Sequence, residues 1–279
     1  MALRTLIVGA VTLTLASGCA AVGAPSASTA GPEASEATPS GPDFSRLPAA
    51  LAATPILWLA ADRDVMTESE GAVTEWKGVG GTGRPAARNE RPTLVEGGIA
   101  DRPVLRFDGK DDQLEVAEVD INPSVHPDLT VIAVFSSDVA EVEDPLFRKL
   151  YGHDDAGFDR SAGLDDRAMR NYTLFGGDGS GVVGYFDLAP DTTYLTVDVW
   201  HPTTVQGWVN GKNVLGKGWP VDNAEGLPTF FIGGTGTVFR EPWQGDIAEV
   251  LVFDGALPDA ARIAVEDFLA LKYDIELSR

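Results

Sequence analysis

A succession of short apolar runs, separated by glycine, proline, asparagine and aspartate, constrains the fold of this chain more than any other feature. After residue 50 the runs fall at residues 56–62, 73–78, 103–109, 112–117, 129–137, 145–152, 172–177, 182–189, 193–200, 204–211, 229–234 and 246–254. Many short strands with turn signals between them, and no helices alternating with them, predict a β-sandwich or barrel. The pair Asn210-Gly211 predicts a two-residue hairpin turn, because both positions tolerate positive φ.

A single helix is predicted near the C-terminus, over residues 257–275. Pro258 suits the first helical position, where its missing N–H costs nothing. Asp259 in the first turn and Lys272 in the last turn both favour the helix dipole. The apolar residues that recur every three or four positions, and that we expect to face the sandwich, are Ala261, Val265, Phe268, Leu271 and Ile275.

The N-terminus has the pattern of a bacterial lipoprotein signal. Arg4 supplies a positive charge, and residues 6–16 form an apolar run that is too short to span a bilayer. The sequence LASGC at residues 15–19 resembles a lipobox, which implies cleavage before Cys19 and acylation of that cysteine. An ordinary signal peptide that contains a cysteine is the alternative. We expect an extracytoplasmic protein anchored to the bacterial cell envelope through lipidated Cys19, since several acyl chains, at about 0.8 kcal/mol per buried methylene, anchor stably.

Composition divides the chain into a signal segment at 1–19, a linker at 20–48 and a folded domain at 49–279. The linker is rich in proline, alanine, serine, threonine and glycine, and it lacks the apolar content that would offset the entropy of ordering it. Because Cys19 is the only cysteine, the domain has no intrachain disulfide. A domain of roughly 230 residues buries about 70% of its extended-chain surface, so none is required.

The chain is strongly acidic, with a formal net charge of −21, and loss of the signal with Arg4 leaves −22. This charge makes nucleic acid and anionic lipid headgroups poor partners, so we expect membrane contact through the lipid anchor alone. The negative charge is explained by a need for solubility. The alternative explanation is functional: an affinity for divalent cations or basic partners. We expect the protein to be a monomer.

Several segments together resemble the concanavalin A-like lectin/glucanase superfamily, in its laminin-G-like branch. They include ILWLAAD at 56–62, RPTLVEGGIADRPVLRFDGKDDQLEV at 91–116 and the GWVNGK hairpin at 207–212. The closing segment GDIAEVLVFDGALPDAARIAVEDFLALKYDI at 245–275 is the most specific of them. The resemblance implies an all-β jelly roll of two antiparallel sheets with one C-terminal helix. The family contains sugar-binding modules, adhesion domains, hydrolases and lyases, so the fold does not choose among them.

The residues that catalysis would need are missing from the pattern. Hydrolases of this family carry a Glu-x-Asp-x-x-Glu run, and here Glu141 and Glu143 share a parity without a surrounding strand pattern. Glu249 lies among apolar neighbours in 246–254, and we expect a buried structural acid paired with an arginine. Alternation places it on one face with Ile247. The three histidines are scattered and form no zinc pattern.

The stretch YGHDDAGFDRSAGLDDR at 151–167 is read as a long loop between strands. One hypothesis is a calcium site formed by Asp154, Asp155 and Asp159, because calcium prefers oxygen ligands and glycine-containing loops present them without strain. The competing hypothesis is an ion-pair network in which Arg160, Arg167 and Arg170 neutralise the aspartates, here including Asp165 and Asp166. Apart from calcium, we expect no cofactor.

Sugar-binding sites combine an aromatic platform with polar groups. Trp58 and Trp76 lie in early strands and are expected in the core. We predict that Trp219, Trp243 and Arg240 contact the ligand, with both tryptophans partly exposed. The sequence therefore predicts a non-catalytic binding module for a polysaccharide or glycoprotein. A protein-interaction or adhesion module, with an envelope or extracellular protein as partner, and a divergent polysaccharide hydrolase or lyase are the alternatives.

Overall fold

A computed structural model of the protein describes residues 43–48, 53–139, 147–155, 157–165, 171–177, 186–236 and 241–279. Cys19, Arg240, Glu141, Glu143, Arg167 and Arg170 lie outside these residues. Residues 43–279 form one compact unit. Phe44, in the segment assigned to the linker, packs edge-on against Phe268 with ring centroids 5.7 Å apart. Among the described helices, none has the length and apolar character that a membrane span requires.

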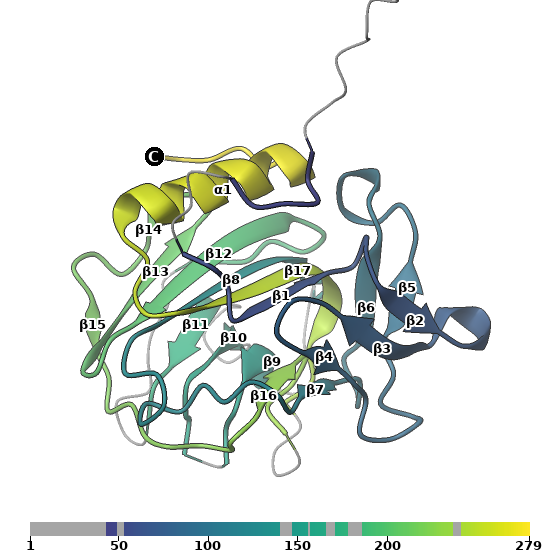
Figure 1. Ribbon diagram of the computed structural model, residues 1–279, viewed down its shortest axis with the longest axis horizontal. Helices are drawn as coiled ribbons and strands as arrows, with labels where there is room; N and C mark the ends of the chain where they lie inside the picture. Colours follow the sequence, from purple (N-terminus) through teal and green to yellow (C-terminus); the bar gives the residue numbers. More distant parts are fainter. Residues whose placement is uncertain are drawn as a thin grey trace, which may run out of the picture. The chain divides into compact units, whose positions relative to one another are not determined.

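A nine-stranded sheet lies between the helix and the other large sheet (Figure 1). Its path runs through β14 (Lys212–Asn213), β13 (Thr204–Val209), β12 (Thr193–Trp200), β8 (Leu129–Ser136), β17 (Gln244–Asp254), β6 (Val104–Asp108) and β5 (Thr93–Val95), while β1 (Leu57–Ala60) pairs with β17 and β15 (Trp219–Pro220) pairs with β13. The central strands β8 and β17 are covered on both faces, which explains why their sequences are nearly continuous apolar runs.

Two smaller sheets complete the strand structure. The five-stranded sheet has the order β11 (Asn171–Phe175), β10 (Ser161–Asp165), β9 (Phe147–Gly152), β16 (Phe230–Ile232) and β7 (Leu114–Val116). The three-stranded sheet has the order β2 (Val65–Thr67), β3 (Val73–Lys77) and β4 (Thr82–Gly83). Short 3-10 helices occur at Ser69–Gly71 (η1) and Ile99–Asp101 (η2). The prediction of a mostly β domain with one C-terminal helix is confirmed in the described residues, with three sheets instead of two.

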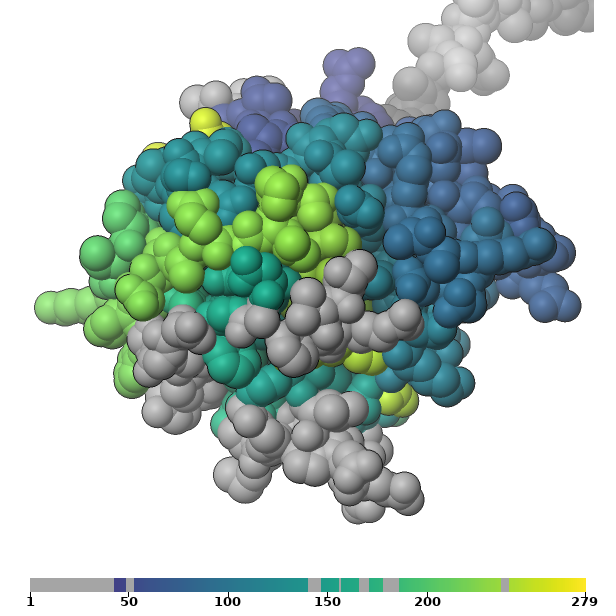
Figure 2. Space-filling view, turned by 90° about the horizontal axis from the view of Figure 1, so that it is seen from below, coloured from purple at the N-terminus to yellow at the C-terminus, as the bar shows by residue number. Residues whose placement is uncertain are grey.

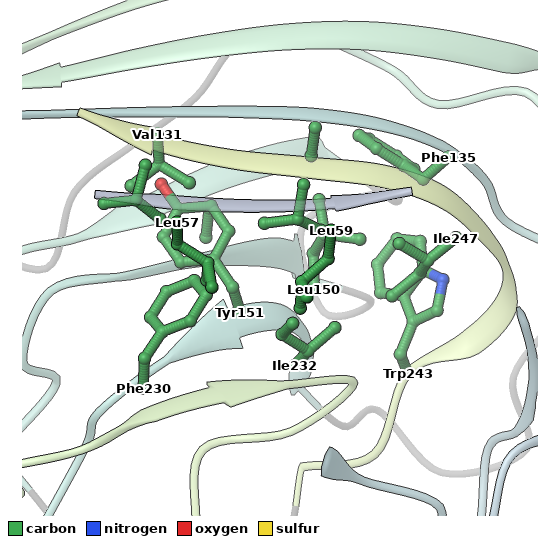
Figure 3. Packing of buried hydrophobic residues seen from close by; sticks show 14 of the residues in the cluster. Leu57, Leu59, Val131, Phe135, Leu150, Tyr151, Phe230, Ile232, Trp243 and Ile247 are labelled. Carbon is green, nitrogen blue, oxygen red and sulfur yellow. The ribbon is translucent and has the colours of Figure 1, made fainter. Parts of the chain in front are cut away.

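The main hydrophobic core lies between the nine-stranded and five-stranded sheets (Figure 3). Leu59 and Phe135 enter it from the first sheet, and Tyr151 and Ile232 enter it from the second. Trp243 packs edge-on against Phe135, with centroids 5.3 Å apart at 88°. Because side chains alternate across a strand, each sheet presents its other face away from this core.

Helix α1 (Asp259–Tyr273) covers the other face of the nine-stranded sheet, over a second apolar cluster that includes Val134, Val197 and Leu251 (Figure 1). Asp259 lies in its first turn and Lys272 in its last turn, as predicted. Pro258 is the N-cap residue, one position before the predicted place.

The predicted stripe of α1 is confirmed at Ala261, Val265, Phe268 and Ile275, which pack on the second apolar cluster, and it is wrong at Leu271. Val265 is buried as expected, but Leu271 is 64% exposed. Lys272 and the pair Arg262–Glu266 occupy the interface instead, and the Arg262 guanidinium lies 4.3 Å from the Trp208 ring centroid. A rule that counts only apolar residues therefore misses the charged side chains that share this face.

An irregularity in β17 interrupts the predicted alternation before Glu249. The register against β8 shifts between Ile247 and Glu249. As a result Ile247 faces the main core, while Ala248 lies in the cluster under α1, on the side to which Glu249 also points. The prediction that Ile247 and Glu249 share a face is wrong because a β-bulge adds one residue to the count.

The acidic stretch at 151–167 also differs from its prediction as one long loop. Residues 161–165 form strand β10, which pairs with both β9 and β11. The connection itself is confined to the residues between Gly152 and Ser161. In contrast, the predicted Asn210-Gly211 turn is confirmed, with φ values of 47° and 78° between β13 and β14.

Candidate functional site

The connection between β9 and β10 brings three carboxylates together. The two strands are antiparallel neighbours, with Gly152 opposite Ser161. One carboxylate oxygen from each of Asp154, Asp155 and Asp159 lies within 4.8 Å of the others. Asp154 and Asp159 are buried, and Asp155 is exposed. The fold therefore places side by side the three residues that the sequence predicts as calcium ligands. We call this group the acidic triad.

Asp159 is the most perturbed member of the acidic triad. Its Oδ2 accepts a hydrogen bond of 3.1 Å from the Asp155 backbone N–H, while its buried Oδ1 has no hydrogen-bond partner. Burial, together with the charges of Asp154 and Asp155, raises the pKa of Asp159 to about 6. A buried carboxylate oxygen without a partner is costly, and a cation at this point would remove that cost. The donor set therefore suits a hard cation with oxygen ligands.

Arg160 does not neutralise the triad. Its Nε donates 2.8 Å to Asn223 Oδ1, and its terminal nitrogens donate to the backbone carbonyls of Ile121, His126 and Pro127 at 3.2, 2.6 and 2.9 Å. Among the described residues, no arginine or lysine forms an ion pair with Asp155 or Asp159. The ion-pair hypothesis is wrong for Arg160, because backbone carbonyls already use its donors.

A neighbouring segment holds the loop from the other side. The Leu227 N–H donates 2.6 Å to the His153 carbonyl, and His153 Nδ1 donates 3.1 Å to the Leu227 carbonyl. Burial lowers the pKa of His153 to about 4, so the ring is neutral at pH 7. A Cβ on Gly226 would lie 2.3 Å from the His153 carbonyl oxygen and 3.0 Å from Asp159 Oδ2. Glycine is required there because the two segments approach so closely.

An aromatic cluster lies on the face of the five-stranded sheet that points away from the main core. Phe147 meets Phe158 and Phe175 edge-on at 5.5 and 5.2 Å, and Phe158 stacks on Phe175 at 5.9 Å and 18°. Phe147 and Phe158 are each partly exposed, and Phe158 directly precedes Asp159 of the triad. Figure 2 views the molecule from this side, opposite α1. None of these phenylalanines is among the ligand contacts predicted from the sequence.

Lys149 connects the aromatic cluster to the acidic triad. Its buried ammonium lies 3.1 Å from the Phe175 ring centroid and donates 2.9 Å to Ser161 Oγ, which donates in turn to the Asp159 carbonyl at 2.9 Å. Burial lowers the pKa of Lys149 to about 8, and Glu241 at 3.6 Å and Asp154 oppose that shift. The ammonium is thus a cation at neutral pH, fixed beneath the rings.

The two tryptophans predicted to be partly exposed differ in their exposure. Trp219 is partly exposed, at the edge of the nine-stranded sheet, where it pairs with Val205. Trp243 is fully buried in the main core, so its predicted exposure is wrong and its ring offers no face to a ligand. Trp58 and Trp76 are buried, as predicted. The third predicted ligand contact, Arg240, lies outside the described residues.

A second acidic group lies at the end of β6. It was not predicted from the sequence. One carboxylate oxygen from each of Asp108, Asp111 and Asp112 lies within 4.8 Å of the others, and the sequence DGKDD at 108–112 was its signal. The carboxylates of this turn have partners within the turn. Asp112 Oδ2 accepts a hydrogen bond of 2.8 Å from the Asp108 N–H, and Lys110 Nζ lies 3.3 Å from the Asp108 carboxylate. Local backbone and side-chain contacts explain this group.

Glu249 is structural, with a different partner from the one predicted. Its carboxylate accepts hydrogen bonds from Lys272 Nζ and the Tyr273 hydroxyl, both at 2.7 Å, and also from Trp58 Nε1. The prediction of an arginine partner is wrong, because the last turn of α1 places a lysine over the strand. Glu249 is fully buried and therefore cannot meet a substrate.

The described fold is shared by domains found in enzymes that act on glycans. The chain is similar to domain 4 of AbnA, an extracellular arabinanase of family GH43 from Geobacillus stearothermophilus, in a structure with arabinotriose. The TM-score is 0.51 at 14% identity, over 77% of this chain and 98% of that domain. Since that domain is matched almost entirely, the shared unit is a complete domain.

Two further structures contain a similar domain within a longer chain. A Trypanosoma rangeli sialidase in complex with sialic acid matches with a TM-score of 0.52 at 14% identity, over 77% of this chain and 32% of the sialidase. A GH54 α-L-arabinofuranosidase soaked with a cyclic sulfate inhibitor matches with a TM-score of 0.52 at 10% identity, over 72% and 51%. No protein family model and no curated protein matches the chain. Because the sequence identities are only 10% to 14%, the similarity to these structures shows a shared fold and nothing more.

Proposed function

We propose that this protein is a non-catalytic carbohydrate-binding module of the laminin-G-like jelly-roll type, held at the cell envelope by a lipid on Cys19. The observation that carries the proposal is the partly exposed aromatic cluster of Phe147 and Phe158 beside the acidic triad. Aromatic faces pack on sugar rings, and carboxylates accept hydrogen bonds from sugar hydroxyls. The similar arabinanase domain, whose structure contains arabinotriose, supports a glycan ligand.

Calcium is proposed as the cofactor of this site, held by Asp154, Asp155 and Asp159. Its support is the convergence of three carboxylates within 4.8 Å and the unpartnered buried Oδ1 of Asp159. A bound cation would hold the β9–β10 connection in place and so position Phe158, which is adjacent to the ligand Asp159. The protein would thus present its aromatic cluster to a ligand in a fixed orientation.

A hydrolase is the second candidate, favoured by one observation: the pKa of Asp159 is raised to about 6 beside two further aspartates. A carboxyl group with a raised pKa next to an ionised one is the arrangement of a glycosidase acid and its partner. Asp159, however, is fully buried and cannot reach a glycosidic oxygen. This geometry favours a structural cation over catalysis.

The binding proposal is tested by titrating the full chain with arabinotriose and a panel of other oligosaccharides in a calorimeter, with and without calcium. Phe147→Ala should weaken binding at least tenfold, whereas Trp219→Ala tests the alternative platform at the sheet edge. Capture of an envelope protein, with no binding to any glycan, would support the interaction module instead. Release of reducing sugar would support the hydrolase.

The calcium proposal has a matched pair of variants. Calcium at 100 times its dissociation constant should stabilise the folded protein by about 2.7 kcal/mol. Asp159→Asn should abolish this response, and Asp111→Asn, in the other acidic group, should retain it. A melting temperature that neither calcium nor a chelator changes contradicts the proposed site.

A further inference from the structure

A separate pocket lies on the face of the nine-stranded sheet that carries α1. Its volume is about 300 Å³, at the lower end of the range for small-molecule sites. Loop residues Gly97–Ala100 form one wall. The polar residues that line it are Arg106, Ser136, Asp138, Asp191, Thr193 and Asp246.

Strand pairing explains why these polar groups form a row. Thr193 is opposite Ser136, Asp246 is opposite Arg106, and β8 and β17 are neighbours. Each of these four side chains lies two residues from a member of the apolar cluster under α1, as Ser136 does from Val134, so the four share that face of the sheet. The sheet face thus changes from apolar to polar where the helix no longer covers it.

Two polar groups of this pocket have no hydrogen-bond partner among the residues that the structure describes. Ser136 is only 7% exposed, and its hydroxyl makes no hydrogen bond to any described residue. The carboxylate of Asp138 likewise accepts none from the described residues. By contrast, Arg106 donates two hydrogen bonds of 2.8 Å to the Asp246 carboxylate. The pocket therefore offers one fixed guanidinium–carboxylate pair together with an available hydroxyl and an available carboxylate.

The charges favour a cationic ligand. Three carboxylates, those of Asp138, Asp191 and Asp246, face one guanidinium in the pocket. Burial raises the pKa of Asp138, and the charge of Asp246 raises it further. A cation beside Asp138 would stabilise its ionised form.

We propose that this pocket binds a sugar unit that carries a primary ammonium group, a 2-amino-2-deoxyhexose within an oligosaccharide. Asp138 and Asp191 receive the ammonium group. The Arg106–Asp246 pair offers a donor and an acceptor side by side, which matches neighbouring hydroxyls, and Ser136 supplies a further partner. This site is distinct from the acidic triad, and its ligand chemistry does not depend on the function proposed there.

The surroundings favour a chain of sugars over a single amine. A second pocket of about 510 Å³ shares Ala100 and Thr193 with the first. It runs past Asn210 to Glu276 and Ser278 near the C-terminus, and it adds the carboxylates of Asp274 and Glu276. Adjacent units of an oligosaccharide would occupy this continuation.

The test compares three trimers by calorimetry with the full chain: β-1,4-linked glucosamine, N-acetylglucosamine and glucose. The glucosamine trimer should bind at least tenfold more tightly than the other two, because only it carries ammonium groups. Asp138→Asn should remove that preference. Ser136→Ala should weaken binding of the glucosamine trimer several-fold, with no change in the fold, because the hydroxyl makes no hydrogen bond within the described part of the chain.

Asp111→Asn is the matched control, since it makes the same change in net charge at a residue that does not line the pocket. It should leave binding of the glucosamine trimer unchanged, and Asp138→Asn should leave the calcium response unchanged. Equal affinity for the three trimers, or equal loss in Asp138→Asn and Asp111→Asn, overturns the proposal. Binding of a lysine tripeptide in place of the glucosamine trimer overturns the sugar assignment. If Phe147→Ala loses arabinotriose binding but keeps the preference for the glucosamine trimer, the result supports the aromatic cluster as a separate site and leaves the pocket proposal standing.

Discussion

Asp198 makes the stability of this protein depend on pH, and Asp198→Asn should remove that dependence. The residue lies in strand β12 and is fully buried against the five-stranded sheet. The hydroxyls of Tyr151 and Tyr172 donate to its Oδ2 at 2.8 and 2.6 Å, while its Oδ1 has no partner. Burial raises the pKa of Asp198 from 3.8 to about 7, although both tyrosine hydrogen bonds lower it.

Between pH 3.8 and about 7 the folded protein holds one more proton at Asp198 than the unfolded chain does. The free energy of unfolding therefore falls as the pH rises through this window. Because one pKa unit corresponds to about 1.4 kcal/mol, the loss from Asp198 reaches about 4 kcal/mol by pH 8. The asparagine variant does not titrate, so its stability relative to the natural protein should rise by this amount between pH 4 and pH 8.

Urea denaturation of both proteins at unit steps of pH measures this difference. Contributions from other carboxylates cancel, and the replacement of acid by amide adds only a constant. Tyr172→Phe is the companion variant: it removes one hydrogen bond to the carboxylate, so the pKa of Asp198 should rise and the loss of stability should extend to higher pH. A difference between Asp198→Asn and the natural protein that stays flat from pH 4 to pH 8 would refute the reasoning.

Three further predictions concern packing. Lys272→Met should destabilise the protein by about 3–5 kcal/mol because it leaves the Glu249 carboxylate buried without its cation, and adding Glu249→Gln should recover part of the loss in urea denaturation. Leu269→Ala should cost about 2–5 kcal/mol, whereas Leu271→Ala, at a 64% exposed position, should cost less than about 0.5 kcal/mol; equal losses would contradict the observed face of α1. Gly226→Ala should lower both the melting temperature and the calcium response, since its Cβ would lie 2.3 Å from a carbonyl oxygen of the acidic loop; an unchanged calcium response would show that this approach does not shape the triad.

The three aspartates of the acidic triad were recognisable in the sequence because they are close in the chain. A connection of a few residues between two antiparallel strands keeps such carboxylates together in any fold. The aromatic cluster was not recognisable, because Phe147, Phe158 and Phe175 come from two strands and a loop. Only the pairing of β9 with β10 and of β10 with β11 brings them together.

Some predictions about which way a side chain faces were wrong because the tertiary structure departs from the local pattern. The bulge in β17 separates Ile247 from Glu249, although alternation places them on one face. Trp243 was predicted to be partly exposed and to contact a ligand, yet it packs in the main core beside Phe135. In each case the outcome depends on a partner that is distant in the sequence.

The sequence by itself determined the mostly β character, the position of most strands, the C-terminal helix and the hairpin at Asn210-Gly211, because these follow from local periodicity and backbone preference. Tertiary structure alone decided which residues face outward. It buried Lys272 against Glu249, made Ser161–Asp165 a strand, and assembled the polar row from Thr193 to Arg106. The physical reason is that local patterns fix the conformation of a segment, whereas exposure and charge pairing are set by neighbours that only the folded chain supplies.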